Sequence, residues 1–590
     1  MADDIRNTDI LFVHADSFYN LNYSLFNVGM LYIATMCKNA GYHVRCMANS
    51  DLFHLSREQL SLVIKYMRPK VIGFYTLTDN FRQVKAYAEL FKSLVPCKVV
   101  LGGPLANIAP EKLIVPACFD VAVRGEGEYV MLKLADLFIK RQGSIENIES
   151  VTYKKLGRII SNPQGPQIQD LDALPFPDHS LVGMNQGFHM STGRGCPYQC
   201  AFCFQKVHGA AFRYRSPQNI VDEIIYHMES TNAKNFFITD DVFAVNPKRV
   251  MEFCRLLTEY RKRTKKEFIF FCEGRAEVLS RHPEMMEALS ECGMARLQIG
   301  IESGCQEMLR AYGKKLAIED IYKTAELAGK MNCFTLTGNF IIGGPHETEE
   351  TFERSLKFAK SLIKAAPGVF EMNSSFLTAL PDTPIDRDPA RFGIKVLDRE
   401  FCKGMTLNDA YCRTEALDRD DLRALGKRFR EETYKAMKKE VVKLKFSDIE
   451  RHVIWSRKFL MDTLYHMEFM ASCPVITSYF DFYSSPRFKR LENIPAEELE
   501  YFIPNRTIED RQYVKRGLRT PASFGRTIYL GEGLEREIYE YAASKLSIKE
   551  TAERLVKELG RDETPHDFMQ NAMLPIYKKF EDNYQMLFWR

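Results

Sequence analysis

The sequence predicts an α/β protein with three regions: an N-terminal doubly wound parallel sheet, a central partial (β/α)6 barrel and a mostly helical C-terminal region. Short apolar strands alternate with amphipathic helices in the first 140 residues. Six strand-then-helix units follow from Gly187, and helix-forming stretches with mixed charges dominate after residue 390. Alternating strands and helices favour parallel sheets, because right-handed crossover helices then cover both faces.

Length and composition favour several folded domains. The chain has 590 residues, of which 45% are hydrophobic and 27% charged, and one domain takes about 150 residues. The net charge of +4 is nearly neutral for this length and gives no case for nucleic acid. No run of 18 apolar residues and no signal-peptide pattern occurs, so we expect no membrane span and a cytoplasmic location.

Residues 1–140 are predicted to form the doubly wound sheet. The expected elements are strands at 10–13, 44–47, 71–75, 98–101 and 121–123, with helices at 28–40 and 81–94. Ligands on such sheets bind beyond the carboxyl ends of the strands. Small or polar residues collect there, at 76–78, 102–104 and 124–128. Glycines at such turns let backbone N–H groups approach a bulky or anionic ligand, although each turn alone also fits an ordinary strand-to-helix connection.

Residues 141–186 are predicted to form a linker, which Pro175 and Pro177 stiffen into an extended tether between two domains. Residues 187–390 are predicted to form the partial barrel. Its strands are expected near 188–192, 236–239, 268–272, 296–300, 334–342 and 371–378. Its helices are expected to begin near Pro217, Pro247, Pro283, Ile318 and Glu349. Proline is favoured in the first helical turn, and the site of such a barrel lies at the carboxyl ends of its strands.

Residues 391–590 are predicted to be mostly helical. Helices are expected at 419–443, 447–470, 534–543 and 548–559. Basic and acidic residues alternate along them, as on a solvated helical face. The end of this region resembles a winged-helix or peptide-binding domain.

Three cysteines in eight residues, Cys196, Cys200 and Cys203, carry the most specific signal. Their spacing, C-x3-C-x2-C, lets them converge on one iron–sulfur cluster. Three ligands leave one iron of a [4Fe–4S] cube open to a substrate or cofactor. Gly195 and Pro197 shape a loop around the motif, which disfavours chance spacing. The other twelve of the fifteen cysteines are scattered, a pattern typical of a reducing compartment.

This motif, with Phe202 before the last cysteine, resembles the signature of the radical S-adenosylmethionine (SAM) enzymes. Over about the first 390 residues, the order of regions resembles the cobalamin-binding subclass, whose members include methylases. The resemblance implies three cofactors: a [4Fe–4S] cluster, SAM and cobalamin. It makes the first region a Rossmann-like cobalamin-binding domain and the second a radical SAM barrel.

The resemblance also implies roles for individual residues, with the three cysteines as cluster ligands and Phe202 beside the adenine of SAM. It assigns Asp240 and Asp241 to the methionine amino group, Arg275 to the methionine carboxylate, Glu302 to the ribose and Gly343 to the support of the adenine. Each also has an ordinary reading: the aspartates as a helix cap, Arg275 in a salt bridge and Glu302 as a solvated strand end.

For cobalamin, the resemblance implies that six residues line the corrin and its nucleotide tail: Thr76, Thr78, Gly102, Gly103, Gly125 and Glu126. The sequence departs from cobalamin domains that carry Asp-x-His-x-x-Gly after the first strand, because that motif does not occur here. The lower axial position of cobalamin is therefore unassigned, and His14 is interpreted as a strand-end histidine. Many members of the radical subclass also lack the motif.

The leading hypothesis is a methyltransferase that acts on an unactivated carbon or phosphorus centre through a 5′-deoxyadenosyl radical and methylcobalamin. One alternative keeps cobalamin but catalyses a non-methylating rearrangement or oxidation, and another performs a radical reaction without cobalamin. A non-enzyme alternative is a corrinoid and iron–sulfur sensor or carrier. The expected partners are a small-molecule or peptide substrate and an electron donor such as flavodoxin or ferredoxin; no catalytic side chain is assigned.

Overall fold

A computed structural model describes residues 8–15, 26–78, 80–183, 187–204, 211–398, 409–472, 479–480, 487–507, 512–514, 517–521, 527–530, 533–582 and 585–589. The chain divides into two compact units, Met1–Met437 and Lys438–Arg590, and each is described by itself. The domain boundaries predicted at residues 140, 186 and 390 stay predictions. Within the described ranges, no helix is long and apolar enough to cross a membrane.

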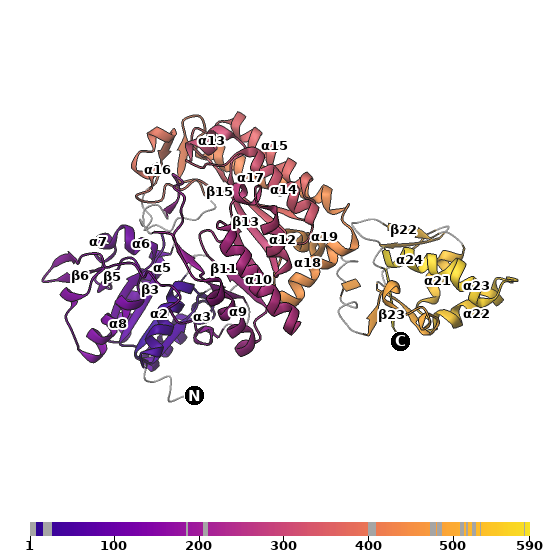
Figure 1. Cartoon of the computed structure of the whole chain (residues 1–590), viewed down its shortest axis with the longest axis horizontal. Coiled ribbons are helices and arrows are strands. Elements are labelled where there is room, and N and C mark those ends of the chain that lie inside the picture. Colours follow the sequence, from indigo (N-terminus) through magenta and orange to yellow (C-terminus); the bar gives the residue numbers. More distant parts are fainter. Residues whose placement is uncertain are drawn as a thin grey trace. The chain divides into compact units, whose positions relative to one another are not determined.

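The first unit begins with a seven-stranded sheet in the order β2-β1-β3-β4-β5-β6-β7 (Figure 1). Its strands are β1 (Ile10–Val13), β2 (Val44–Met47), β3 (Val71–Tyr75), β4 (Lys98–Gly102), β5 (Val121–Val123), β6 (Val151–Lys155) and β7 (Arg158–Ser161). Strands β1 to β5 are parallel, and β6 and β7 add to the edge in antiparallel orientation. The five predicted strands agree with the structure to within one residue.

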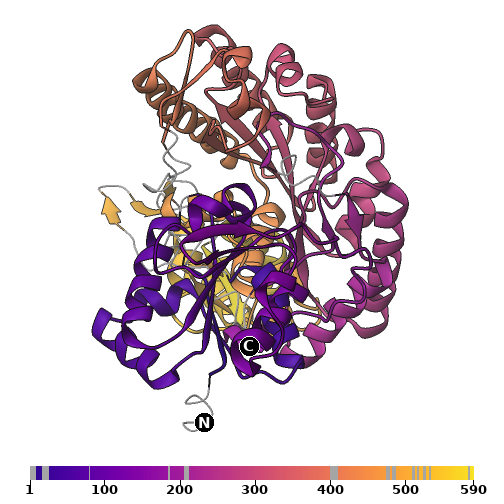
Figure 2. The ribbon, with the colours of Figure 1, turned by 90° about the vertical axis from the view of Figure 1, so that its left-hand side faces the viewer.

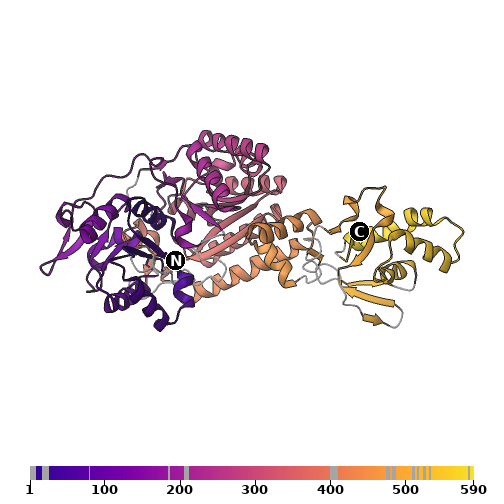
Figure 3. The same cartoon turned by 90° about the horizontal axis from the view of Figure 1, so that it is seen from below.

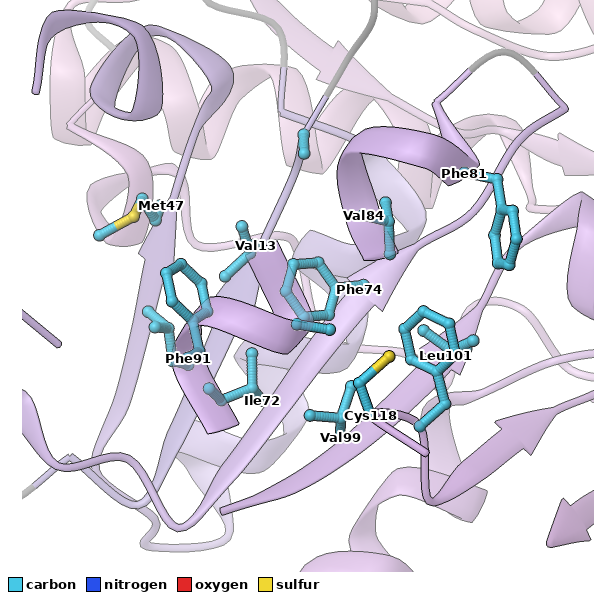
Figure 4. Close-up of a cluster of buried hydrophobic side chains, with 14 of the residues drawn as sticks. Val13, Met47, Ile72, Phe74, Phe81, Val84, Phe91, Val99, Leu101 and Cys118 are labelled. Atoms are coloured by element: carbon cyan, nitrogen blue, oxygen red, sulfur yellow. The ribbon is translucent and has the colours of Figure 1, made fainter. Parts of the chain in front are cut away.

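Helices cover both faces of this sheet and bury an apolar core on each. They are α2 (Val28–Asn39), α3 (Asn49–His54), α4 (Arg57–Met67), α5 (Phe81–Leu94), α6 (Pro104–Ile108), α7 (Pro110–Leu113), α8 (Glu128–Ala135) and the π-helix η1 (Asp136–Lys140). Figure 4 shows one core, in which Ile72 of β3 and Phe91 of α5 pack together. The next residue back along β3, Val71, enters the other core with Met131 of α8. Successive side chains of a strand point to opposite faces, which explains why these buried strands are apolar throughout.

The segment predicted as a linker differs in part from that expectation. Residues 151–161 form the hairpin of β6 and β7, which extends the sheet instead of crossing between domains as a tether. The hairpin was not predicted because β7 is mostly exposed and lacks an apolar run. Downstream, the backbone N–H of Asp178 donates a hydrogen bond to the hydroxyl oxygen of Thr35 at 2.8 Å, so this stretch lies against α2.

The barrel sheet has six parallel strands in the order β15-β14-β13-β12-β11-β8. They are β8 (Phe188–Met190), β11 (Asn235–Ile238), β12 (Ile269–Gly274), β13 (Met294–Glu302), β14 (Thr335–Ile342) and β15 (Phe370–Phe376). Figure 2 shows them as an open arc with helices on the outer side. The predicted open barrel of six parallel strands is confirmed.

The outer helices are α9 (Pro217–Thr231), α10 (Pro247–Thr264), α11 (Ala276–Leu279), α12 (Pro283–Glu291), α13 (Gln306–Ala311), α14 (Ile318–Met331), α15 (Glu349–Ala365) and α16 (Pro384–Arg387). All five predicted helix starts are confirmed. Ser216 and Asn246 cap the two helices that follow them, each accepting a hydrogen bond from the backbone three residues on. A short antiparallel pair, β16 (Ile394–Val396) and β17 (Cys412–Thr414), follows the barrel.

Helix α17 (Arg419–Val441) spans the boundary between the units, and the second unit is shown in Figure 3. Its helices are α18 (Phe446–Phe459), α19 (Leu464–Ser472), α21 (Leu534–Tyr541), α22 (Ile548–Glu558), α23 (Pro565–Phe568) and α24 (Leu574–Asp582). The single helix predicted over 447–470 is wrong: Leu460 takes a left-handed backbone with φ 57° and ends α18.

Two small antiparallel sheets in the second unit were not predicted. One has the order β18-β23-β19, from β18 (Phe488–Lys489), β23 (Met586–Trp589) and β19 (Ile503–Arg506). The other comprises β20 (Gln512–Val514), β21 (Gly517–Pro521) and β22 (Thr527–Leu530). Helices still make up most of the described unit, as expected. Its assignment as a winged-helix or peptide-binding domain stays a prediction.

Candidate functional site

The three cysteines of the motif lie on a loop that follows β8, the first strand of the barrel. Short strands β9 (Gly193–Arg194) and β10 (Arg213–Tyr214) pair on either side of this loop. Cys196, Cys200 and Cys203 line one cavity of about 500 Å³, here called the cluster cavity. None of the three forms a disulfide. The structure therefore brings the three predicted ligands together at the carboxyl end of the barrel.

These thiols suit an iron–sulfur cube better than a single ion. Across the described ranges, no three His, Cys, Asp or Glu side chains lie close enough to share one metal ion. In a [4Fe–4S] cube each thiolate binds a different iron, so the thiols surround the cube instead of meeting at a point. Three thiols around one cavity fit that arrangement and leave one iron for a cofactor.

Phe202 lines the cluster cavity and packs edge-on against the buried Tyr312, with ring centroids 5.0 Å apart at 83°. The neighbouring Ala201 donates its N–H to the carbonyl of Tyr312 at 2.8 Å and accepts from Ile385 at 3.2 Å. The cysteine loop is therefore held from behind by two later segments of the barrel. A rigid ring at this wall suits a residue that packs beside an adenine.

Asp240 and Asp241, predicted together as SAM contacts, have different surroundings. Asp240 is 4% exposed, and its carboxylate accepts from the backbone N–H of Thr192 at 2.6 Å and from the Thr192 hydroxyl at 2.5 Å. Burial raises the pKa of Asp240. Asp241 lines the cluster cavity. Asp241 therefore lines the same cavity as the thiols, whereas Asp240 is hydrogen-bonded to Thr192 in the segment that precedes the first cysteine.

Arg275, directly after β12, lines the cluster cavity and contacts the cysteine loop. Its guanidinium carbon lies 4.0 Å from the ring centroid of Tyr198. One terminal nitrogen lies 2.7 Å from the Glu277 carboxylate. Arg275 therefore forms the salt bridge of the ordinary reading and also lines the cavity, and its contact with the methionine carboxylate stays a prediction.

Glu302, at the end of β13, also lines the cluster cavity. Its backbone is left-handed, with φ 64°, a strained conformation that is concentrated at functional sites. Lys314 approaches its carboxylate at 2.6 Å and the carbonyl of Gly300 at 2.7 Å. Lys314 lines the cavity too and was not predicted, because no motif marks a lysine twelve residues along the chain.

Gly343 supports the end of β14 from outside the cluster cavity. Its N–H and that of Gly344, at 3.1 Å, both donate to the carboxylate of Glu347. Glu347 is buried, which raises its pKa to about 7. Gly343 has φ +80°, and a Cβ there would meet Leu422 of α17 at 3.1 Å. The turn therefore requires glycine for its backbone and its packing.

A second, apolar cavity of about 240 Å³ lies at the carboxyl ends of the N-terminal strands. Of the residues predicted for cobalamin, Gly102, Gly103, Gly125 and Glu126 line it. A Cβ built on Gly102 has no atom within 4 Å, so open space faces this glycine. An apolar chamber with glycines at its mouth fits a bulky ring that needs close backbone approach.

Thr76 and Thr78 do not line this apolar cavity. Thr76 is fully buried, and its hydroxyl donates to the carbonyl of Gly102 at 2.7 Å. It therefore ties the end of β3 to the glycine turn after β4. Thr78 is half-buried on the following turn.

A third cavity, of about 710 Å³, lies between the other two and is here called the bridging cavity. It shares Gly125, Glu126 and Arg194 with the apolar cavity. It shares Asp241 with the cluster cavity. The three cavities therefore have common walls, from the N-terminal sheet to the thiols.

An ion-pair cluster at the first of these shared walls was missed by sequence reasoning. Arg194, two residues before Cys196, pairs with Glu126 at 2.9 Å and with Glu128 at 2.5 Å. Arg213, its partner across the β9–β10 pair, lies 2.9 Å from Glu126. Burial alone would raise the pKa of Glu126, but hydrogen bonds from Arg213 and Arg194 lower it. The glycine turn after β5 is thereby joined to the start of the cysteine loop.

Three cysteine thiols lie at the mouth of an open parallel barrel, and common walls join their cavity to an apolar chamber on a doubly wound sheet. This arrangement defines an enzyme with two cofactor-binding regions. Comparison with known proteins agrees. Residues 190–359 match the Radical SAM superfamily, and residues 19–135 match the B12 binding domain. The chain therefore combines a radical SAM region with a B12-binding region, as the cobalamin-binding radical SAM enzymes do; it is a radical SAM enzyme, and its cofactors are a [4Fe–4S] cluster, SAM and cobalamin.

Relatives in this family include methyltransferases and a cyclase. An uncharacterized methyltransferase of Pyrococcus horikoshii is 28% identical over 57% of this chain and 73% of the relative. An anaerobic magnesium-protoporphyrin IX monomethyl ester cyclase of Cereibacter sphaeroides is 24% identical, over 56% and 55% of the two chains. Hopanoid C-3 methylase of Methylococcus capsulatus is 25% identical, over 55% and 62%. The chain thus spans about half to three quarters of the length of these relatives.

Solved structures share the fold. The radical SAM methyltransferase TsrM from Kitasatospora setae, solved with cobalamin and a [4Fe–4S] cluster, matches with a TM-score of 0.59 and 13% identity over 81% of this chain and 96% of TsrM. The cobalamin-dependent SAM radical enzyme OxsB matches with a TM-score of 0.57 and 14% identity over 98% and 84%. At these identities the likeness establishes the architecture alone.

Proposed function

We propose that this chain is a cobalamin-dependent radical SAM methyltransferase that methylates an unactivated carbon or phosphorus centre. The observation that carries the proposal is that the three cavities share walls. The bridging cavity shares Glu126 and Arg194 with the apolar cavity, and it shares Asp241 with the cluster cavity. A substrate that extends from the cluster cavity into the bridging cavity would face both cofactors. When bound, the cluster and SAM supply a 5′-deoxyadenosyl radical, and cobalamin supplies the methyl group.

The positions of the residues support specific roles. We assign Cys196, Cys200 and Cys203 to the cluster, and Phe202 to the adenine. Asp241 suits the methionine amino group because it lines the cavity beside the thiols and carries a carboxylate. Asp240 accepts a hydrogen bond from Thr192, and we assign it the role of positioning the neighbouring Asp241.

Two further side chains complete the proposed SAM site. Arg275 suits the methionine carboxylate, since its cationic group faces the cavity next to the cysteine loop. Glu302 suits the ribose hydroxyls, since Lys314 contacts its carboxylate at 2.6 Å and the carboxylate oxygens can accept hydrogen bonds from a diol. Gly343 supports this site indirectly, because its N–H donates to Glu347 and so fixes the turn after β14.

On the cobalamin side, we assign Gly102, Gly103 and Gly125 to the cavity wall that accepts the ligand. Thr76 supports that wall through the carbonyl of Gly102. The substrate is a small molecule or peptide, and a flavodoxin or ferredoxin supplies electrons. A cytoplasmic location suits the enzyme, because a reducing compartment keeps the cluster thiols free.

A second candidate is a non-methylating radical reaction, which the similarity to a cyclase favours. Product analysis separates the two. Reconstituted, cobalamin-loaded protein is incubated anaerobically with reductant, methyl-deuterated SAM and a panel of candidate substrates. Methylation predicts a product with one CD3 in place of hydrogen, together with S-adenosylhomocysteine. A product without the label, formed with 5′-deoxyadenosine alone, would establish the second candidate instead.

A further inference from the structure

A row of polar side chains crosses the barrel sheet, and one of them, Glu273, lines the cluster cavity. Glu273 of β12 is in register with Gln298 of β13, which is in register with Thr337 of β14 and then Glu371 of β15. Because strand side chains alternate, residues in register face the same side of the sheet. The row therefore reaches the site proposed for SAM and substrate at Glu273.

Glu273 has no cationic partner at salt-bridge distance in the described part of the chain. Its carboxylate accepts one hydrogen bond, from the side-chain amide of Gln298 at 2.8 Å. The two cations that line the same cavity are already engaged, because Lys314 pairs with Glu302 and Arg275 pairs with Glu277. Glu371, at the other end of the row, has Arg296 at 3.5 Å. Glu273 is thus the carboxylate of this row that lacks a counter-charge.

The electrostatic surroundings of Glu273 are negative. Burial is the main cause that raises its pKa to about 7, and the charges of Asp241, Asp240 and Glu302 raise it further. A carboxyl in this setting gains stability from a cation more than from any other ligand, since a cation offsets both desolvation and repulsion. A perturbed carboxyl in a cavity also marks a functional site when geometry agrees.

The layer above Glu273 is neutral and forms hydrogen bonds. Asn339 of β14 is in register with Asn373 of β15, and their side-chain amides lie 3.5 Å apart. Both line the cavity, as does Ser375. These groups suit hydroxyls or amides of a polar ligand, and Phe340, Phe376 and Leu377 of the same cavity can pack against its carbon skeleton.

We propose that Glu273 is the substrate-binding carboxylate of this enzyme and that the substrate is a polar molecule which presents a protonated amine to it. This inference rests on the proposed function and adds the substrate class. The carboxylate of Glu273 and the ammonium form a charge-assisted hydrogen bond, and Asn339, Asn373 and Ser375 receive the remaining polar groups. The ion pair fixes the orientation of the substrate in the cavity that holds the thiols.

A matched pair of small probes tests the charge requirement. 1,4-Diaminobutane and 1,4-butanediol have the same length and differ in charge. Each is titrated into reconstituted, cobalamin-loaded protein with SAM, and the half-effect concentration on 5′-deoxyadenosine formation is measured at pH 8. We expect the diamine to act at a concentration about 10- to 100-fold lower than the diol, the range of a charge-assisted hydrogen bond.

Two variants locate that preference. In Glu273→Gln we expect the diamine and the diol to act at about the same concentration, while KM for SAM is unchanged. The control is Glu319→Gln, at an exposed residue of α14, which should keep the native preference for the diamine. In the native protein the affinity for the diamine rises with pH through about 7, where Glu273 ionises, and in Glu273→Gln it does not. The remaining cavity charges, Asp241, Glu302, Arg275 and Lys314, are the same in both proteins.

Three results would overturn the proposal: equal action of diamine and diol on the native protein, a preference that survives Glu273→Gln, or a rise in KM for SAM in that variant. The last would make Glu273 a SAM contact. If the native protein forms no 5′-deoxyadenosine, the proposed function fails on its own account. Calorimetric titration of the same two probes into the same protein then decides the amine preference separately.

Discussion

Cys203 closes the cysteine motif and lies half-buried in the cluster cavity. Replacing it with alanine removes one of three proposed ligands, so Cys203→Ala should lose the cluster and with it SAM cleavage. The control is Cys333→Ala, at an exposed cysteine elsewhere in the barrel. Iron content and 5′-deoxyadenosine formation measure both effects. Deoxyadenosine formation by Cys203→Ala at the native rate would refute this ligand assignment.

Alanine variants of Asp240 and Asp241 should differ in effect, the first lowering the stability of the fold and the second weakening the binding of SAM. Asp240→Ala leaves the Thr192 N–H and hydroxyl without their acceptor in a buried site, which costs about 2–4 kcal/mol of unfolding free energy. Asp241→Ala should leave stability nearly unchanged and weaken SAM binding about tenfold or more, the effect of losing one charge-assisted contact. Thermal unfolding and SAM titration distinguish the two. Equal loss of SAM affinity with equal stability in both variants would contradict the division of roles.

At the residue scale, the sequence predicts chemistry that is local in the chain and misses chemistry that is not. The spacing of the three cysteines is enough to predict the loop that binds the cluster. The Asp240–Asp241 pair gives no sign of which carboxylate faces the cavity, because neighbouring residues after a strand can point to opposite sides. The partner of Glu126 is Arg194, 68 residues away, and only the fold brings them together.

At the element scale, the Glu126–Arg194 contact joins the glycine turn after β5 to the start of the cysteine loop. Glu126→Gln removes the charge that faces both Arg194 and Arg213, in a site where side chains are at most 19% exposed. Breaking such a pair costs about 3–5 kcal/mol, so we expect lower thermal stability. The control is Glu307→Gln, whose pair with Arg354 is about half exposed and should matter little.

The same variant has a spectroscopic consequence. Pulsed electron paramagnetic resonance on protein with reduced cluster and cob(II)alamin reports the spread of distances between the two cofactors. Because Glu126 holds the loop that carries the thiols, Glu126→Gln should broaden that distribution relative to native protein and Glu307→Gln. An unchanged distribution would show that the contact stabilises the fold without positioning the cofactors.

Strand β4 offers a direct test of the apolar cavity. Gly102 has an ordinary strand backbone and open space where a Cβ would point, so Gly102→Leu can fill the cavity with little clash. We expect corrinoid retention to fall at least about tenfold, since the space for the ring is occupied, while iron content stays native. The exposed Gln83→Leu on α5 is the control. Native corrinoid content in Gly102→Leu would move cobalamin out of this cavity.

Elements with strong local signals were predictable, and the others were not. The helices that begin at Pro217, Pro247 and Pro283 carry proline in their first turn, a signal independent of the rest of the fold. The β6–β7 hairpin lies at a sheet edge with one exposed strand, so it shows no clear alternation. The break at Leu460 depends on a left-handed residue that is neither glycine nor asparagine.

At the scale of the whole molecule, buried histidines should limit stability in acid. His179 packs against Phe188 and His227, with ring centroids 4.7 and 4.9 Å away. Burial, followed by the charges of His227 and His189, lowers its pKa from 6.5 to about 3. The unfolded chain therefore binds a proton below pH 6.5 that the folded chain refuses until about pH 3. Stability is full above pH 6.5 and falls by about 1.4 kcal/mol per pH unit between those values.

His179→Phe should remove this acid sensitivity, because phenylalanine fills the same aromatic site without a proton to bind. Denaturant unfolding at pH 7 and pH 5 measures the difference, with the exposed His282→Phe as the control. We expect the native protein and His282→Phe to lose more stability between the two pH values than His179→Phe does. Identical pH dependence in all three would contradict a neutral, buried His179.

The central claim is that one chain holds a SAM-cleaving cluster and a corrinoid at adjoining cavities and uses both. The most direct measurement is to quantify 5′-deoxyadenosine and S-adenosylhomocysteine in one anaerobic reaction of cobalamin-loaded, cluster-reconstituted protein with SAM and reductant. The account predicts that both form, the first from radical cleavage and the second from methyl donation. Formation of neither, by protein that carries its cluster and corrinoid, would contradict it.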